Sequence, residues 1–154
     1  MKSQNFTLIL LVFLALSKSS SAQLNGTYTI GGTTPDYATI PAAITAIQTG
    51  GVSGPVIFNI RPGTYQGKVD IGNIPGTSAT NTVTIKSENG DSTSVILTDS
   101  ANALTSNFTV HIFGTDYLTI RNLTIRRPGS DASSCVFLIA LNSRFLQIRN
   151  NIIE

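Results

Sequence analysis

The chain has 154 residues, of which 10 are Lys or Arg and 8 are Asp or Glu, and its formal net charge is +2. This near-neutral balance gives no electrostatic reason to expect nucleic acid or an anionic membrane surface as a partner, because both favour strongly basic surfaces. The single cysteine, Cys135, excludes an intramolecular disulfide, and we expect it to be a small buried side chain. With a single histidine, His111, the chain has too few ligands for a metal centre of the His and Cys type.

Residues 1–22 have the layout of a secretory signal peptide, in which Lys2 precedes an apolar run from Leu8 to Leu16 and small residues lead up to Ala22. The run is far shorter than the roughly 20 residues of a membrane-spanning helix, so we expect cleavage and not a permanent anchor. Cleavage removes Lys2 and Lys18, which leaves 10 minus 2, or 8, basic residues against 8 acidic ones. We therefore expect a secreted or cell-surface protein with no membrane contact after cleavage, and its neutral charge leaves a polysaccharide open as partner.

Residues 23–36 predict a short strand and a Gly-rich turn, and residues 37–51 predict a helix. Thr39 is suited to the N-cap, and Pro41 is tolerated in the first turn. Gly51 follows the last helical residues, as glycine commonly does. The predicted apolar face, with spacings of three and four, consists of Ile40, Ala43, Ile44 and Ile47.

Residues 52–154 change to strands of three to five residues separated by turn residues, as in VIFNI, TVTIKS and YLTI. Such strands suit two architectures, an antiparallel sandwich and a parallel β-solenoid. A repeat favours the solenoid, because YLTIRN from Tyr117 returns as FLQIRN from Phe145, an offset of 145 minus 117, or 28 residues. We therefore predict an all-β solenoid of about four coils whose first coil is covered by the helix.

In a solenoid, equivalent residues of successive coils lie about 4.8 Å apart, so the repeat predicts which side chains stack. The residues expected to point inward are Leu118, Ile120, Leu146 and Ile148, and those expected to point outward are Tyr117, Thr119 and Arg121. The same alignment places His111 opposite Ile139, so we expect His111 to pack within a strand.

A tight corner is predicted where Asn122 stacks on Asn150, each side chain bonding the next and satisfying the backbone of the turn; in the alternative, asparagine merely suits any turn. Asn151 competes with Asn150 for the inner place, and Leu123 matches Asn151 poorly. The register beyond the corner therefore stays open.

The segments YATIPAAITAIQTGG, PVIFNIRPGTYQGKVDI, TVTIKSENGDSTSVILT and RNLTI together resemble the N-terminal part of right-handed parallel β-helix proteins of the pectin lyase-like superfamily. They are most similar to the start of the pectin methylesterases, and the likeness covers residues 37–154. The shared motifs, such as T-I-x-x-A-I and R-P-G-T-Y, belong to the framework, which lyases, esterases, polygalacturonases and non-catalytic surface proteins have in common.

For catalysis, the resemblance implies aspartates from motifs such as D-F-I-F-G in an esterase, or Ca²⁺ held by acidic side chains in a lyase. The esterase motif does not occur here, and in HIFGTD the carboxylate of Asp116 follows the glycine and begins a turn. The acidic residues are scattered. We therefore expect no catalytic residue, metal site or cofactor in this segment, with Ca²⁺ relevant only to a lyase.

Three arginines, Arg121, Arg126 and Arg149, are the candidate substrate-binding residues. Arg121 and Arg149 form an exposed basic column if the 28-residue register holds, and Arg126 and Arg127 end the strand LTIRR. Such arginines bind uronate carboxylates or, in the alternative, only keep an outer face soluble.

The leading functional hypothesis is an exported β-helix domain that binds or acts on extracellular polysaccharide, with pectin-like uronates as the first candidate and esterase or lyase chemistry. The alternative is a non-catalytic cell-surface or adhesion solenoid. Because a finished solenoid needs a C-terminal cap and the last coil is apolar, we expect the remainder of a longer polypeptide, including any catalytic coils, beyond Glu154.

Overall fold

A computed structural model describes residues 22–100, 107–129 and 134–154. The predicted signal peptide lies, up to residue 21, outside the described residues. Within the described ranges, no helix is long and apolar enough to cross a membrane.

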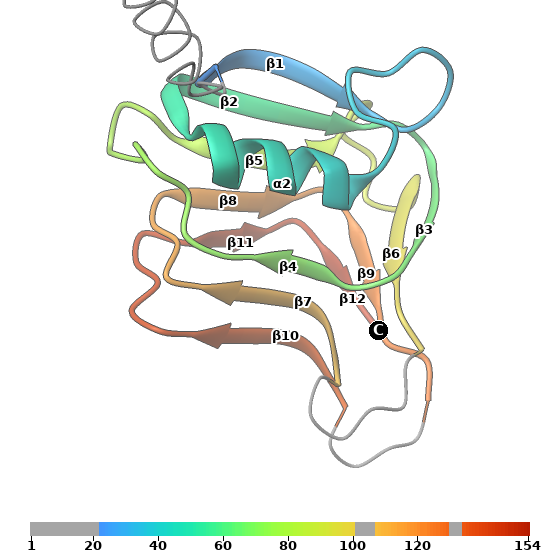
Figure 1. The fold of residues 1–154 in the computed structure, drawn as a ribbon. Helices are drawn as coiled ribbons and strands as arrows, with labels where there is room; N and C mark the ends of the chain where they lie inside the picture. Colours follow the sequence, from blue (N-terminus) through green and yellow to red (C-terminus); the bar gives the residue numbers. More distant parts are fainter. Residues whose placement is uncertain (1–21, 101–106, 130–133) are drawn as a thin grey trace, which may run out of the picture.

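The chain winds through three parallel sheets, which form a right-handed parallel β-helix of about four coils (Figure 1). We call them sheet A (order β1-β2-β5-β8-β11), sheet B (order β12-β9-β6-β3) and sheet C (order β10-β7-β4). The predicted solenoid is confirmed, and the antiparallel sandwich is wrong because all strand pairs among the described residues are parallel. The strands are β1 (Leu24–Ile30), β2 (Val52–Ile60), β3 (Gly63–Gln66), β4 (Val69–Ile71), β5 (Val83–Ser87), β6 (Val95–Thr98), β7 (Phe108–Phe113), β8 (Leu118–Arg121), β9 (Thr124–Arg126), β10 (Cys135–Ala140), β11 (Gln147–Arg149) and β12 (Ile152–Ile153).

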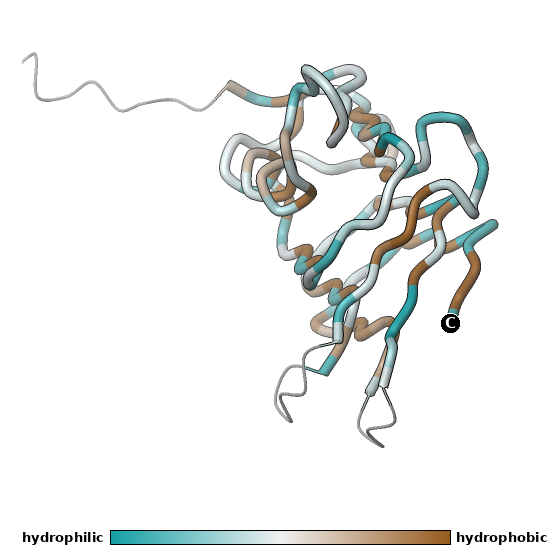
Figure 2. Tube along the Cα trace, turned by 90° about the vertical axis from the view of Figure 1, so that its right-hand side faces the viewer, coloured by the Kyte–Doolittle hydropathy of each residue, from teal (hydrophilic) through white to brown (hydrophobic). Residues whose placement is uncertain are grey.

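The predicted helix is confirmed as α2 (Ile40–Gly50). Thr39 Oγ1 accepts the N–H of Ala42 at 3.3 Å, and Gly51, at φ 72°, donates its N–H to the carbonyl of Ile47 at 2.8 Å. The predicted apolar face is buried and joins the core of the coils. Apolar and polar residues alternate along the coils (Figure 2), so each sheet turns one face to this core.

The 28-residue offset is confirmed in sheets A and B. In sheet A, Thr119 pairs with Gln147 and Arg121 with Arg149, and beyond the corner Thr124 pairs with Ile152. The register beyond the corner, which the sequence left open, therefore has the same 28-residue offset as the register before it.

In sheet C the offset is 27 residues, so the alignment of His111 with Ile139 is wrong: His111 pairs with Leu138. The difference of one residue is absorbed in the turn that follows. The earlier coil turns through Gly114 at φ 61°, whereas the later coil uses two left-handed residues, Leu141 and Asn142, at φ 52° and 53°.

The asparagine corner is present, but the side chain of Asn122 bonds another turn and not Asn150, and Asn151 takes the inner place. Asn122 and Asn150 both take left-handed backbone, φ 57° and 53°, which asparagine tolerates. The side chain of Asn122 donates to the carbonyl of Gly90 at 2.8 Å. Asn151 joins the two coils, because its Oδ1 accepts the N–H of buried Leu123 at 3.0 Å and its Nδ2 donates to a carbonyl of β8 at 2.9 Å.

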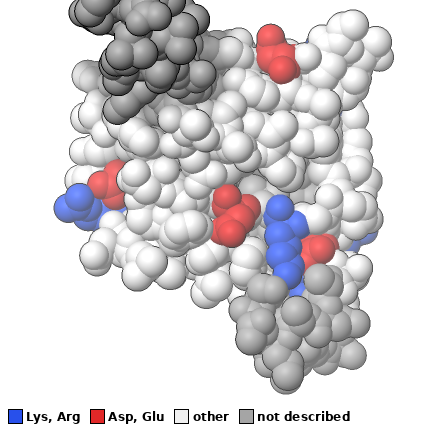
Figure 3. Space-filling view, in the orientation of Figure 1, with Lys and Arg blue, Asp and Glu red and all other residues white. Residues whose placement is uncertain are grey.

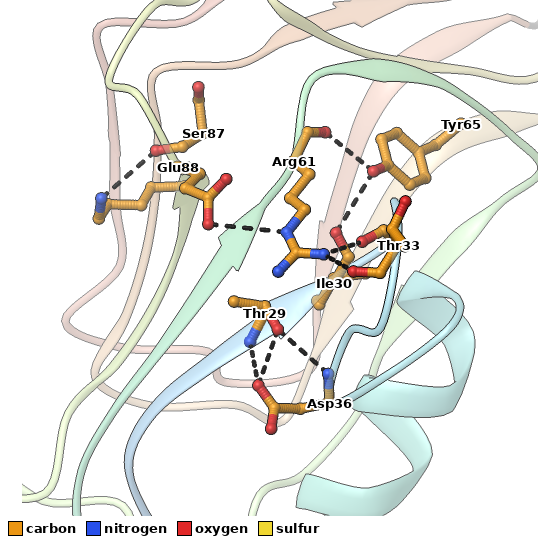
Figure 4. Close-up of polar contacts among 10 residues, drawn as sticks. Thr29, Ile30, Thr33, Asp36, Arg61, Tyr65, Ser87 and Glu88 are labelled. Carbon is orange, nitrogen blue, oxygen red and sulfur yellow. Dashed lines mark hydrogen bonds and ion pairs between the residues drawn. The ribbon is translucent and has the colours of Figure 1, made fainter.

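The R-P-G-T-Y motif fastens the turn that follows β1 (Figure 4). Arg61 donates to the carbonyls of Gly31, at 3.4 Å, and Thr33, and its Nε lies 3.8 Å from a carboxylate oxygen of Glu88. The hydroxyl of Tyr65 donates to the carbonyl of Arg61 at 2.8 Å. A Cβ on Gly31 would lie 2.2 Å from that hydroxyl, so this close approach requires glycine. The motif therefore stabilises the framework.

The last coil is the least covered part of the core. Ile148 lies in register with buried Ile120 but is 38% exposed, and Leu146 packs partly against the core. Cys135 is half-buried, not fully buried as expected, and its Sγ lies 3.4 Å from the carbonyl oxygen of Asn107.

Candidate functional site

The outer face of sheet A carries two rows of side chains that run across β5, β8 and β11. Register places Lys86 beside Arg121 and Arg121 beside Arg149, which we call the cation row. Two positions earlier along each strand lies the polar row of Thr84, Thr119 and Gln147. These residues face out because the intervening positions of β5 and β8 are buried. Neighbouring strands place the cations of the row about 4.8 Å apart at the backbone.

Arg121 and Arg149 form no ion pair with any described residue, and the amine of Lys86 donates to the carbonyl of Ser87 at 3.3 Å. Nε of Arg121 is buried and has no hydrogen-bond partner among the described residues. The other arginines lie beside carboxylates, in the pairs Arg61–Glu88, Arg126–Glu154, Arg127–Asp99 and Arg144–Asp116. Like charges directly opposite on neighbouring strands are destabilising. The cation row is therefore a concentration of positive charge without an internal counter-charge.

Of the three arginines predicted from the sequence, the structure brings Arg121 and Arg149 together and places Arg126 on sheet B. There Nη2 of Arg126 lies 2.6 Å from a carboxylate oxygen of Glu154. Arg127 is buried and donates to Asp99 and to the carbonyl of Phe108, both at 2.9 Å. Arg127 therefore stabilises the fold and is not part of the outer surface.

An aromatic pair stands at the start of the same two strands. The rings of Tyr117 and Phe145 are stacked, with centroids 4.5 Å apart and planes at 11°. Their backbones are left-handed, φ 56° and 55°, an outlier for bulky residues. They border a groove of about 390 Å³, whose lining is Ala79, Thr82, Tyr117, Thr119, Phe145, Leu146 and Gln147.

A second constellation, Asp70 and His111, lies on the outer face of sheet C. Nδ1 of His111 is 2.9 Å from a carboxylate oxygen of Asp70, and the imidazole stacks on Phe113 at 4.8 Å between centroids. The side chains of His111 and Asp70 are 20% and 59% exposed. The expected packing of His111 is present, but its partner Asp70 was not predicted from the sequence. Charges on the face formed by β4, β7 and β10 are few and mixed in sign (Figure 3).

Asp116, the carboxylate of HIFGTD, holds the following coil. Its side chain accepts the N–H of Arg144 at 2.8 Å and an Nη2–H at 3.0 Å. The side-chain bond from Arg144 is the main cause that holds the pKa of Asp116 below its usual value, and the backbone bond acts in the same direction. Asp116 therefore stays ionised in a structural contact.

The described residues contain no group of three or more His, Cys, Asp and Glu side chains that could hold a metal ion. No protein-family model and no curated protein matches this chain at a significant level.

Proposed function

We propose that this protein is an exported β-helix protein of the pectin lyase-like superfamily that binds extracellular polysaccharide, uronate-rich chains first, on the outer face of sheet A. The observation that carries the proposal is the cation row, in which Lys86, Arg121 and Arg149 lie side by side without a carboxylate partner among the described residues. The parallel β-helix and the framework motif R-P-G-T-Y support the superfamily.

The chemistry of the row suits uronates. A uronate polymer carries a carboxylate on each sugar, and a guanidinium group binds a carboxylate through two parallel hydrogen bonds. The hydroxyls of Thr84 and Thr119 and the amide of Gln147 offer hydrogen bonds to sugar hydroxyls. Because Arg149 is exposed and Lys86 and Arg121 are only half-buried, salt reaches the row and weakens binding.

The test is the affinity of the purified protein for polygalacturonate, measured by isothermal titration calorimetry at low and high salt. Exposed ion pairs contribute up to about 1 kcal/mol each, so Arg121→Gln and Arg149→Gln should each weaken binding about fivefold. Arg126→Gln is the matched control, because it removes the same charge on sheet B. Equal effects of all three substitutions, or no binding by the unaltered protein, would refute the proposal.

A second candidate function, an esterase or lyase, is favoured by Asp70 and His111. A carboxylate that holds Nδ1 leaves Nε2 of an imidazole available as an acid or base. Release of methanol from esterified pectin, or of unsaturated uronate from pectate, that is lost in His111→Gln would support it. No turnover by the purified protein would favour the non-catalytic surface solenoid.

A further inference from the structure

The groove beside the aromatic pair differs in chemistry from the cation row. None of the described residues that line it is charged: they include Tyr117 and Phe145, and the polar groups include Thr119 and Gln147 of the polar row. Phe145 is 62% exposed. A pyranose ring presents the matching combination, since it has a face of C–H groups and an edge of hydroxyls.

The backbone of the pair supports a functional role. Left-handed φ values at two aromatic residues in equivalent positions of successive coils are unfavourable for side chains that carry a Cβ. Strained backbone of this kind concentrates at ligand-binding positions. Here it holds the two rings stacked at 4.5 Å beside the groove.

We infer that the groove is a subsite for a sugar ring of the polysaccharide that the cation row binds, and that it recognises the sugar itself, independently of charge. This inference rests on the proposed function. The charge of the neighbouring row favours an acidic saccharide over an apolar peptide as the occupant. The bound chain then runs along the strands, from the aromatic pair toward the arginines.

The geometry sets a minimum length for the ligand. Tyr117 and Arg121, like Phe145 and Arg149, are four residues apart in the chain, and four residues of extended backbone span at most about 13 Å. One sugar is too short to fill the groove and reach the cation row. Galacturonate monomer should therefore bind far more weakly than oligomers long enough to span both.

The experiment compares oligogalacturonates of increasing length with polyglutamate of matched charge, by isothermal titration calorimetry. Phe145→Asn is the main variant, because asparagine tolerates the left-handed backbone and removes the ring. We expect it to weaken binding of the longer oligosaccharides about tenfold and to leave polyglutamate binding unchanged. Arg121→Gln should weaken binding of both ligands.

Two further variants serve as a control and as a substitute for Phe145→Asn. Leu138→Asn removes an exposed apolar side chain on sheet C and should leave affinity unchanged. If Phe145→Asn fails to fold, as judged by circular dichroism, the exposed Gln147→Ala takes its place with the same expectation. Equal losses for oligosaccharide and polyglutamate, or none, would overturn the subsite.

The two proposals fail in different ways. If oligogalacturonate binds and depends on Arg121 but not on Phe145 or Gln147, only the groove assignment is wrong. If no acidic saccharide binds the unaltered protein, the proposed function is wrong and the subsite with it. Tighter capture of an apolar peptide than of oligosaccharide, lost in Phe145→Asn, would assign the groove to a protein partner.

Discussion

Removal of Arg127 should destabilise the fold more than removal of any exposed charge. Its side chain is 4% exposed, and its guanidinium donates to the carboxylate of Asp99 and the carbonyl of Phe108, both at 2.9 Å, and to Asn107. Breaking a buried ion pair by removing one partner costs about 3–5 kcal/mol, because the other charge stays buried without compensation. We therefore expect Arg127→Met to lower the free energy of unfolding in urea by about 3–5 kcal/mol.

A double-mutant cycle tests the reasoning behind this magnitude. Asp99→Asn leaves the bond to the carbonyl of Phe108 in place, so it should cost less than Arg127→Met. The double variant should be less destabilised than the sum of the single variants by about 1–3 kcal/mol, because the second substitution removes a group that has already lost its partner. A loss below about 1 kcal/mol for Arg127→Met, or additive effects, would show that the pair is solvated and refute the argument.

Three further predictions concern the contacts that hold the coils. The lowered pKa of Asp116 stabilises the fold at pH values above 3.8, the ordinary pKa of the carboxyl, and this stabilisation is lost as the pH falls through the folded-state pKa. The difference in unfolding free energy between the unaltered protein and Asp116→Asn should therefore shrink in acid. A difference that grows in acid, or an Arg144→Gln variant without effect on stability at neutral pH, would contradict this. Asn151→Ala should lower the free energy of unfolding by about 1–3 kcal/mol, because the N–H of buried Leu123 loses its acceptor, and faster hydrogen exchange of that amide is the local readout. Thr39→Ala should cost about 1 kcal/mol in urea unfolding, and Thr39→Ser almost nothing, because serine also caps the helix.

Local rules and the repeat were sufficient to predict α2, the parallel stacking and the inward and outward faces of β8, whereas Ile148 of β11, expected to point inward, is exposed in the last coil. The helix carries its own cap and apolar face, and the repeat copies one coil onto the next. The 28-residue offset did not predict the pairing where equivalent turns of successive coils differ in length. Sheet C is shifted by one residue because Leu141 and Asn142 replace the single left-handed Gly114 in the turn.

Insertions explain what the sequence missed in the candidate site. Lys86 joins the cation row at an offset of 121 minus 86, or 35 residues, because the turn ENGDSTS lengthens its coil. Asp70 meets His111 at an offset of 111 minus 70, or 41 residues, because both this turn and the long loop between β4 and β5 lie between the two residues. Neither sequence offset equals the 28-residue period of the repeat. The groove was missed because it depends on the loop that brings Ala79 and Thr82 beside the aromatic pair.

The 28-residue period, applied to charges, separates the arginines that pair with a carboxylate of the adjacent coil from those of the cation row. The partners Asp99 and Arg127, Asp116 and Arg144, and Arg126 and Glu154 are each 28 residues apart.

In these three pairs, the stacking of equivalent positions brings opposite charges together, which stabilises adjacent coils. Arg121 and Arg149 are also 28 residues apart, but there the same stacking brings like charges together. A parallel solenoid pairs each position with its own repeat, so such a row opposes folding unless an anion neutralises it. This is why the outer face of sheet A, and not the more numerous charges elsewhere, is the surface on which to look for an acidic ligand.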